Sequence, residues 1–339
     1  MTIYSCRSVA GTALLMSLWV FCVFATEDQT PLRAMLEKAR AAHNIRKSAL
    51  PAFDLTGTIS LLGKKNTSAQ GLYRLVGTPD GQWKEELKFQ GFTRVRIGDG
   101  KQFAEIQFPP SPIPALNELD SLLNFTRYLA PGKDDVLKTL KASKTAVANC
   151  VKRTSSAASE EVFCIDPQNG NLLSRAKLSP GTYGIAQADS EEFADFQSWS
   201  GKAYPRTLRS LVGKRLWIEV KLEEFKSAPV LPPEFFTVPA NARSWGDCDE
   251  PSVWKLQDRV QPAYPENARR SREQGIVTLY AVIEADGTVH DLQVVHSASP
   301  SLDQSSLQAV SHWRYVPFAC NGSPSRSYTY IDVVYSLMN

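Results

Sequence analysis

Residues 259–287, RVQPAYPENARRSREQGIVTLYAVIEADG, decide the fold of the C-terminal part of the chain. Pro262 and Pro265 stiffen the backbone ahead of a basic stretch, so Pro265 is expected to open a short helix over ENARRSREQ that Gly275 stops. The run IVTLYAVIE then alternates in its apolar residues as a strand does, and the sequence at 285–287 predicts a hairpin turn. The stretch therefore predicts a helix, a strand and a turn in succession.

The following residues extend this pattern to the end of the chain. TVHDLQVVHS is expected to form the return strand of the hairpin, and SYTYIDVVYSL to form the last strand. A helix through SSLQAVSHWRY, capped by Ser301 or Asp303 and ended by Pro317, is predicted between them. The order over residues 251–339 is thus α-β-β-α-β. The last strand is expected at a sheet edge, with one row of backbone groups unpaired.

This region resembles the C-terminal domain of TonB, the energy-transducing protein of the bacterial envelope. The resemblance spans residues 259–338 and rests on QPAYP, on GIV at Gly275, on the Asp-Gly turn, on VHDLQVV and on HWRYVP, in that order. It implies that the domain binds a short extended segment, the TonB box, of an outer-membrane TonB-dependent transporter. In this mode of binding the segment joins the sheet edge as an extra strand.

The resemblance also implies which residues contact the partner. They are Gln261, Pro262, Tyr264 and Pro265 before the first helix, and Arg326, Tyr328, Tyr330 and Asp332 on the last strand. Tyr264 has a second interpretation, in which it sets the direction of the chain and packs on the sheet. Trp313 is expected in the core. The chain departs from TonB because it has no long proline-rich spacer and no histidine in its N-terminal apolar segment, and these departures leave proton-driven transduction without support.

Residues 26–240 predict a helix followed by a meander of antiparallel strands. The helix is expected over 30–48, with a second helical stretch over 113–130. Strands are expected in FDLTGTISLL, in GQWKEELKFQG, in a hairpin over VRIGDGKQFAEIQF, and at 145–151, 161–165, 172–178, 190–199 and 214–226. A proline-rich strap and a linker, 241–250, would join this domain to the C-terminal one. The predicted fold class is α+β.

This N-terminal region is similar to outer-membrane lipoprotein carriers of the LolA/LolB-like kind. Its order of helix, strands, helical insert and closing strands carries the resemblance. Such folds are half-barrels around an apolar cavity, so the resemblance implies that the domain could hold a lipid. A closed spacer domain is the alternative.

The first 25 residues are distinct from the rest. A positive charge at Arg7, the apolar stretch from Val9 to Ala25 and the small residue at its end predict a cleaved signal peptide. The stretch is also close to the roughly 20 residues of a membrane span, so a retained anchor is the alternative. Either case predicts export to the periplasm or cell envelope. A retained anchor would also imply inner-membrane proton-channel partners.

Four cysteines lie beyond the leader, and in an exported chain they predict disulfides. Cys150 and Cys164 end two short strand-like runs around a polar loop, so they are expected to pair. By elimination Cys248 would pair with Cys320, although four cysteines allow three connectivities. A metal site is less favoured because no CxxC motif is present.

Composition and motifs exclude several classes of function. The net charge is +3, with 38 basic and 35 acidic residues spread along the chain, so no nucleic-acid partner is predicted. No GxSxG, HExxH, P-loop or GxGxxG motif is present, and the four histidines are expected at the surface or rim. We therefore predict a protein that is not an enzyme and has no metal or cofactor. It would be an adaptor that binds extended peptides and transduces energy if anchored; the alternative is a periplasmic lipid or lipoprotein carrier that docks through its TonB-like module.

Overall fold

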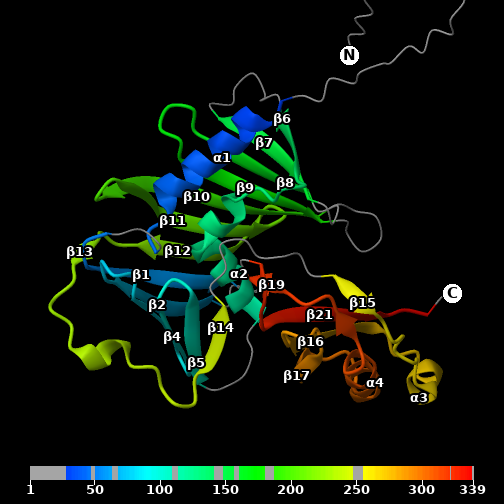
Figure 1. Cartoon of the computed structure of the whole chain (residues 1–339). Helices are drawn as coiled ribbons and strands as arrows, with labels where there is room; N and C mark the ends of the chain where they lie inside the picture. The colour runs from blue at the N-terminus through cyan, green and yellow to red at the C-terminus, as the bar shows by residue number, and fades with distance from the viewer. Residues whose placement is uncertain are drawn as a thin grey trace, which may run out of the picture.

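The computed structural model describes residues 28–46, 50–62, 68–108, 114–140, 148–155, 160–179, 187–246, 255–320 and 322–337. The predicted leader, 1–25, lies outside the described residues. Within the described ranges, no helix is long and apolar enough to cross a membrane. Buried hydrophobic residues form two cores. One core belongs to a large sheet and the other to a small C-terminal sheet, and both sheets are seen in Figure 1.

The large sheet has 14 strands, and all of its pairings are antiparallel. The strand order is β14-β5-β4-β3-β2-β1-β12-β11-β10-β9-β8-β7-β6, and β13 pairs with β1. The antiparallel β-rich domain predicted from the sequence is confirmed. Its strands are β1 (Phe53–Leu62), β2 (Ser68–Gly77), β3 (Trp83–Phe89), β4 (Phe92–Gly98), β5 (Gln102–Phe108), β6 (Val136–Leu140), β7 (Asn149–Thr154), β8 (Glu160–Ile165), β9 (Leu172–Ser179), β10 (Gln187–Trp199), β11 (Lys202–Val212), β12 (Arg215–Leu222), β13 (Lys226–Ser227) and β14 (Arg243–Gly246).

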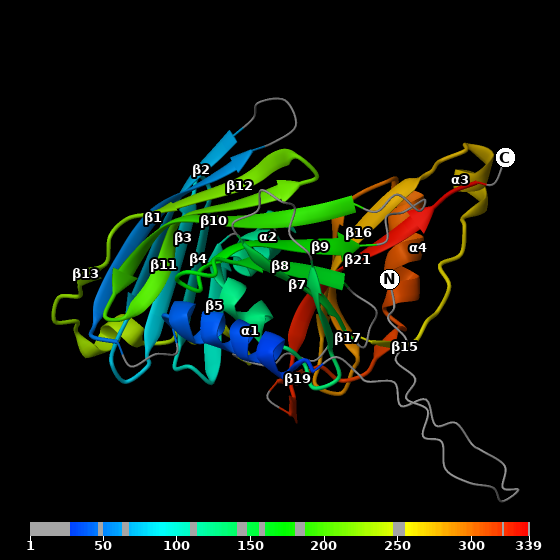
Figure 2. The same ribbon diagram turned by 90° about the horizontal axis from the view of Figure 1, so that it is seen from above.

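Two helices and a helical turn cover one face of this curved sheet (Figure 2). They are α1 (Thr30–His43), α2 (Pro114–Leu123) and the 3-10 turn η1 (Phe125–Leu129); a second such turn, η2 (Pro233–Phe236), lies in the strap. Leu36 of α1 and Leu119 of α2 share a core with strand residues such as Phe163. The helix predicted over 30–48 ends at His43 because Asn44 takes an extended backbone conformation.

The helix α2 is held to the sheet by charged side chains on both of its flanks. Asp120 accepts hydrogen bonds from Arg94 and Arg96 of β4. The hydroxyl of Ser121 donates to Glu191 of β10 at 2.7 Å and accepts from Arg175 of β9 at 3.1 Å. Buried charges of this kind are tolerated only where each has a partner.

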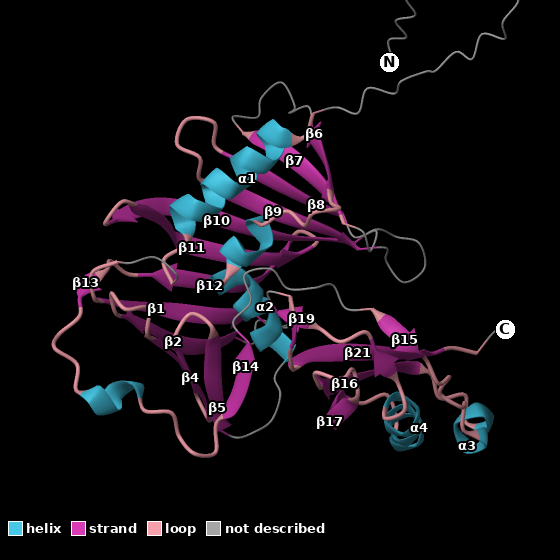
Figure 3. Cartoon of the chain, viewed as in Figure 1, coloured by secondary structure: helices cyan, strands magenta, loops and turns pink. Residues whose placement is uncertain are grey.

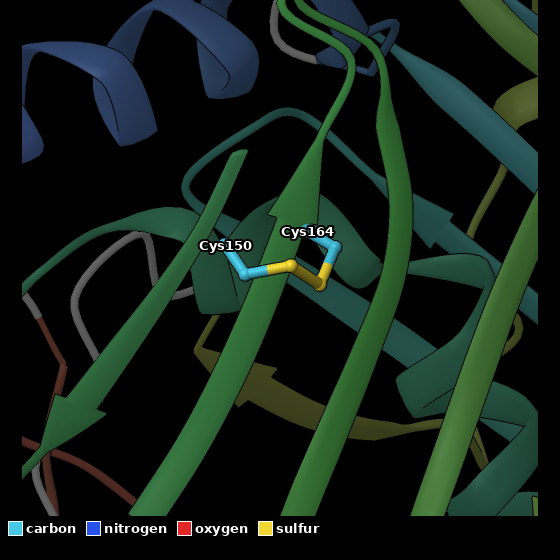
Figure 4. Close-up of a disulfide and its surroundings, with 2 residues drawn as sticks. All are labelled: Cys150 and Cys164. Atoms are coloured by element: carbon cyan, nitrogen blue, oxygen red, sulfur yellow. A yellow bond between two sulfur atoms is a disulfide. The ribbon is translucent and has the colours of Figure 1, made fainter. Parts of the chain in front are cut away.

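One predicted disulfide is confirmed. Cys150 on β7 and Cys164 on β8 lie opposite each other in the ladder and are bonded (Figure 4). Cys320 is also disulfide-bonded. Its expected partner, Cys248, lies outside the described residues, so that pairing stays a prediction.

His43 at the end of α1 is buried, with 2% of its surface exposed, so the expectation of a surface position is wrong. Its Nε2 accepts a hydrogen bond from the backbone N–H of Leu172, so its Nδ1 carries the proton and donates to the carbonyl of Ala203. Burial lowers the pKa of His43, although its backbone hydrogen bonds act against the shift. The ring is therefore held neutral by its surroundings.

This neutral ring predicts a loss of stability in mild acid. The folded-state pKa of His43 lies below its unfolded value, so its contribution is full above the unfolded pKa of about 6.5 and is lost as the pH falls through the folded value. Urea unfolding at pH 7.5 and pH 5.0 should show a decrease of about 1.4 kcal/mol for each unit of pKa shift. A His43→Phe variant should show a smaller decrease between the two pH values. An equal decrease in both proteins would contradict the assignment.

The C-terminal domain is a three-stranded antiparallel sheet with helices on one face (Figure 3). Its strand order is β17-β16-β21, and two short pairs, β15-β18 and β19-β20, lie beside it. The elements are β15 (Leu256–Asp258), α3 (Glu266–Arg270), β16 (Gly275–Ile283), β17 (Val289–His296), α4 (Pro300–Val310), β18 (Arg314–Tyr315), β19 (Ala319–Cys320), β20 (Ser323–Pro324) and β21 (Ser327–Tyr335).

The second helix of this domain differs from its predicted bounds. Helix α4 begins at Pro300, and the side chain of Ser299 accepts from the N–H of Leu302, so neither Ser301 nor Asp303 is the cap. The helix ends at Val310, and residues 314–315 pair with β15 as strand β18. Gly287 lets the hairpin turn approach β18 closely, because a Cβ there would lie 2.0 Å from the carbonyl oxygen of Tyr315.

Candidate functional site

The last strand, β21, lies at the edge of the small sheet. Among the described strands it pairs only with β16, from Gly275 opposite Tyr335 to Ile283 opposite Ser327. The other row of its backbone N–H and C=O groups therefore has no strand partner in the described part of the chain. An edge of this kind is a template for pairing with another extended chain.

The two faces of β21 have different roles. Ile331, Val333 and Tyr335 are buried in the core beneath α4. The opposite, outer face carries Tyr328, Tyr330, Asp332 and Val334, because successive side chains of a strand alternate. Val334 is 48% exposed and stands opposite Ile276, which is 40% exposed. The outer face is thus apolar and open at its C-terminal end.

The residues before α3 form an arm that is bonded to the domain. The indole N–H of Trp313 donates to the carbonyl of Val260 at 2.8 Å. The hydroxyl of Tyr264 donates to the carbonyl of Glu273, and its ring meets the edge of Tyr335 at a centroid distance of 5.5 Å. Pro265 caps α3.

Both interpretations of Tyr264 remain compatible with this geometry. Its ring packs on the end of β21, and it stays partly exposed. Gln261 and Pro262 lie just before it on the arm, and the side chain of Gln261 is exposed. Trp313 is 5% exposed and lies in the core, as predicted.

The other end of β21 contacts the N-terminal domain. The hydroxyl of Tyr328 donates to Asp120 Oδ2 at 3.0 Å, and Arg96 Nη2 lies 3.4 Å from the same hydroxyl. The Tyr328 ring also meets Trp245 of β14, with a centroid distance of 5.4 Å. Burial raises the pKa of Tyr328 well above its usual range, so the phenol is protonated and can donate.

Two residues before Tyr328 in the chain, Arg326 forms a bidentate ion pair with Glu284. Arg326 Nε and Nη2 donate to both carboxylate oxygens of Glu284 at 2.5–3.0 Å. The hydrogen bond from Arg326 lowers the pKa of Glu284. Burial raises the pKa of Tyr280, which stacks on Tyr328, to about 12. The side chains at this end of the sheet therefore keep fixed charge states near neutral pH.

The structure separates the predicted site residues into two groups. Tyr264 lies at the Tyr335 end of β21, while Tyr328 lies opposite Val282 near its start. The seven residue steps from Tyr328 to Tyr335 span roughly 23 Å at about 3.3 Å per residue. Only a ligand extended along the strand could reach both groups. The group at one end consists of Gln261, Pro262, Tyr264 and Pro265, and the group toward the other end consists of Arg326, Tyr328, Tyr330 and Asp332.

Sequence reasoning missed the residues of the N-terminal domain that lie at this site. Asp120, Arg96 and Trp245 approach β21 from three different elements, α2, β4 and β14. Nothing in the sequence relates them to position 328. Part of the predicted linker, 243–246, is itself strand β14 at the edge of the large sheet.

Among the described residues, no group of three or more His, Cys, Asp or Glu could hold a metal ion. What the arrangement offers is a sheet edge flanked by aromatic and polar side chains. Modules that recognise extended peptides by strand addition use a sheet edge of this kind, through backbone hydrogen bonds.

Comparison with known proteins identifies relatives of the C-terminal domain. Residues 260–337 match the family described as Gram-negative bacterial TonB protein C-terminal, so the C-terminal domain belongs to the TonB C-terminal family. Protein TonB of Vibrio cholerae serotype O1 is 31% identical over 90 residues, which are 26% of this chain and 36% of the relative. The chain therefore spans about a third of the length of that relative.

Solved structures resemble the N-terminal domain more distantly. A LolA superfamily protein from Nitrosomonas europaea has a TM-score of 0.41 and 12% identity, covering 60% of this chain and 96% of that one. A putative outer membrane lipoprotein-sorting protein domain from Vibrio parahaemolyticus has a TM-score of 0.39 and 11% identity, covering 60% and 95%. These neighbours match the resemblance predicted for the N-terminal domain.

Proposed function

We propose that this chain is a cell-envelope protein whose C-terminal domain binds extended segments of outer-membrane transporters by strand addition to β21. The observation that carries the proposal is the edge position of β21, whose pairing with β16 covers nine residues. Membership of the domain in the TonB C-terminal family supports the kind of partner. The arm at Gln261–Pro265 would contact the segment at one end and the outer face of β21 would contact it along its length.

Two neighbouring proline variants test this proposal. Successive N–H groups of a strand point to opposite edges, so of residues 332 and 333 one donates toward β16 and the other toward the unpaired edge. Asp332→Pro and Val333→Pro should therefore behave differently. One should lower the melting temperature strongly, while the other should keep more of its stability and lose affinity for the peptide.

The ligands for this test are synthetic peptides that cover the N-terminal segments of TonB-dependent transporters. Binding is measured by fluorescence anisotropy on the full chain, and folding by thermal melts of the same samples. The proposal fails if the more stable of the two proline variants binds every peptide as tightly as the unmodified chain does.

Energy transduction is a further part of the proposal and depends on the leader. Pulling on a transporter needs the apolar segment 9–25 to stay in the membrane, where proton-channel partners could act on it. Mass spectrometry of the mature N-terminus decides this point. A mature chain that starts after Ala25 would rule out proton-coupled pulling through this segment and leave peptide binding unaffected.

One described cavity inside the large sheet gives little room for the lipid that the carrier alternative requires. The cavity between α1 and strands β1, β2 and β11, lined by residues that include His43, Leu55 and Leu208, has a volume of about 40 Å³. One water occupies at least about 10–15 Å³ on this scale, so the cavity has room for only a few water molecules. An acyl chain does not fit there without movement of the helices.

A further inference from the structure

The contact between the two domains falls on the strand that is proposed to receive the peptide. We define the docking contact as Tyr328 with Asp120, Arg96 and Trp245, together with the ion pair between Arg243 and Asp291. The residues that the C-terminal domain contributes to the docking contact lie toward one end of the small sheet, where β21 begins and β17 carries Asp291. The first half of β21 is therefore held by the N-terminal domain, while Asp332 and Val334 are exposed.

An added strand would compete with this contact for space. It would lie about 4.8 Å from β21, and its outward side chains would stand beside those of β21 on the same face. At Tyr328 that face already meets α2 and β14, through Asp120 and Trp245. A peptide paired along the whole of β21 therefore requires the docking contact to open, whereas a peptide paired only beyond Tyr330 does not.

The docking contact has the character of a reversible interaction. It contains two hydrogen bonds at the Tyr328 hydroxyl, which donates to Asp120 and accepts from Arg96, together with one edge-on aromatic contact and one ion pair. The ion pair joins Arg243 Nη1 to Asp291 Oδ2 at 3.0 Å, and both side chains are 47% exposed, so it stabilises the docked arrangement little. Asp120 keeps its two arginine partners when Tyr328 moves away. Opening of the docking contact therefore leaves no buried charge without a partner of opposite sign at Asp120.

We propose that the docking contact is autoinhibitory: the docked protein withholds the first half of β21, and peptide binding along the full strand selects the undocked protein. This inference rests on the proposed strand addition and adds its regulation. The apparent dissociation constant then equals the intrinsic constant divided by the undocked fraction. Any change that loosens the docking contact raises affinity, and any change that fixes it lowers affinity.

A tyrosine variant tests the first half of this statement. Tyr328→Phe removes the hydrogen bond to Asp120 and keeps the ring, and it should raise the affinity of the full chain for the fluorescent transporter peptide by about tenfold. A direct role of the hydroxyl in binding the peptide would lower the affinity instead. Tyr204→Phe is the matched control, because Tyr204 is buried in the N-terminal domain, where its hydroxyl bonds to the carbonyl of Glu223.

A covalent lock tests the second half. The double variant Arg243→Cys, Asp291→Cys, joined by a short bismaleimide, keeps the domains docked, and it should bind the peptide at least tenfold more weakly than the same variant before cross-linking. Amide hydrogen exchange at residues 327–330 should rise in Tyr328→Phe and fall in the cross-linked protein.

The outcomes separate this inference from the proposed function. Equal affinity of the unmodified, Tyr328→Phe and cross-linked proteins would overturn the autoinhibitory role and leave strand addition standing. A lower affinity in Tyr328→Phe would likewise overturn it. Absence of peptide binding in all forms would overturn the proposed function and the autoinhibitory contact with it.

Discussion

Replacing Asp120 by Ala is expected to lower the free energy of unfolding by about 3–5 kcal/mol. Asp120 is 14% exposed and accepts from two arginines, with Arg94 Nη2 at 2.5 Å and Arg96 Nη2 at 2.7 Å. Both arginines are buried, so removal of the carboxylate leaves two buried cations with one acceptor fewer. The loss should be measured by urea unfolding at pH 7.

The control for this variant lies on the same helix. Glu118→Gln changes a partly exposed carboxylate two residues earlier and should shift the unfolding free energy by no more than about 0.5 kcal/mol. A double-mutant cycle with Tyr328→Phe should also show coupling of roughly 0.5 kcal/mol or more, since the two side chains are hydrogen-bonded. If Asp120→Ala lowers the free energy of unfolding as little as Glu118→Gln does, the stabilising role of the ion pairs between Asp120, Arg94 and Arg96 is contradicted.

Replacing Trp313 by Ala is expected to destabilise the C-terminal domain by about 3–5 kcal/mol. The side chain is 5% exposed, lies in the domain core and donates its indole N–H to Val260. The variant loses the buried volume and also the bond that holds the arm. Amide exchange should therefore increase over residues 255–265 before the rest of the domain opens.

Val316→Ala is the matched control for Trp313. It lies three residues later, is 41% exposed, and contributes a backbone bond to Lys255 that the substitution keeps. Its effect on stability should stay within about 0.5 kcal/mol. Equal exchange over residues 255–265 in Trp313→Ala and Val316→Ala would contradict the anchoring of the arm by the indole.

Local patterns predicted much of the C-terminal domain. The alternation in IVTLYAVIE and the Asp-Gly turn at 286–287 correspond to β16 and the hairpin to β17. The start of α4 was misplaced because Ser301 and Asp303 are also good caps, whereas Ser299 is followed directly by Pro300, the stronger signal. The carboxylate of Asp303 instead accepts from the Ser297 hydroxyl.

The N-terminal domain shows where such patterns fail. Strand β11 was not predicted, because KAYPRTLRSLV contains Pro205 and breaks the simple alternation; in the structure Pro205 stands opposite Phe196 of β10 at an irregular point of the ladder. The buried position of His43 also has no local signal. It depends on Leu172 and Ala203, which lie more than a hundred residues away along the chain.

The same limit applies to the candidate site. Residues on the arm and on β21 could be named from their motifs, but the contact of Tyr328 with Asp120 joins positions 208 residues apart. It depends on how the two domains pack, and no periodicity or motif in either domain encodes that. The edge position of β21 was predictable from the element order, whereas the partial cover of its first half was not.

An N-methyl scan of a bound transporter peptide tests strand addition most directly. Each backbone N–H of the peptide is replaced in turn by N–CH₃, and the affinity for the full chain is measured. Strand addition predicts losses at every second residue, of roughly tenfold each, because alternate N–H groups face β21 and an unmade backbone hydrogen bond costs about 1–3 kcal/mol. Losses without a period of two, or no losses at all, would contradict it.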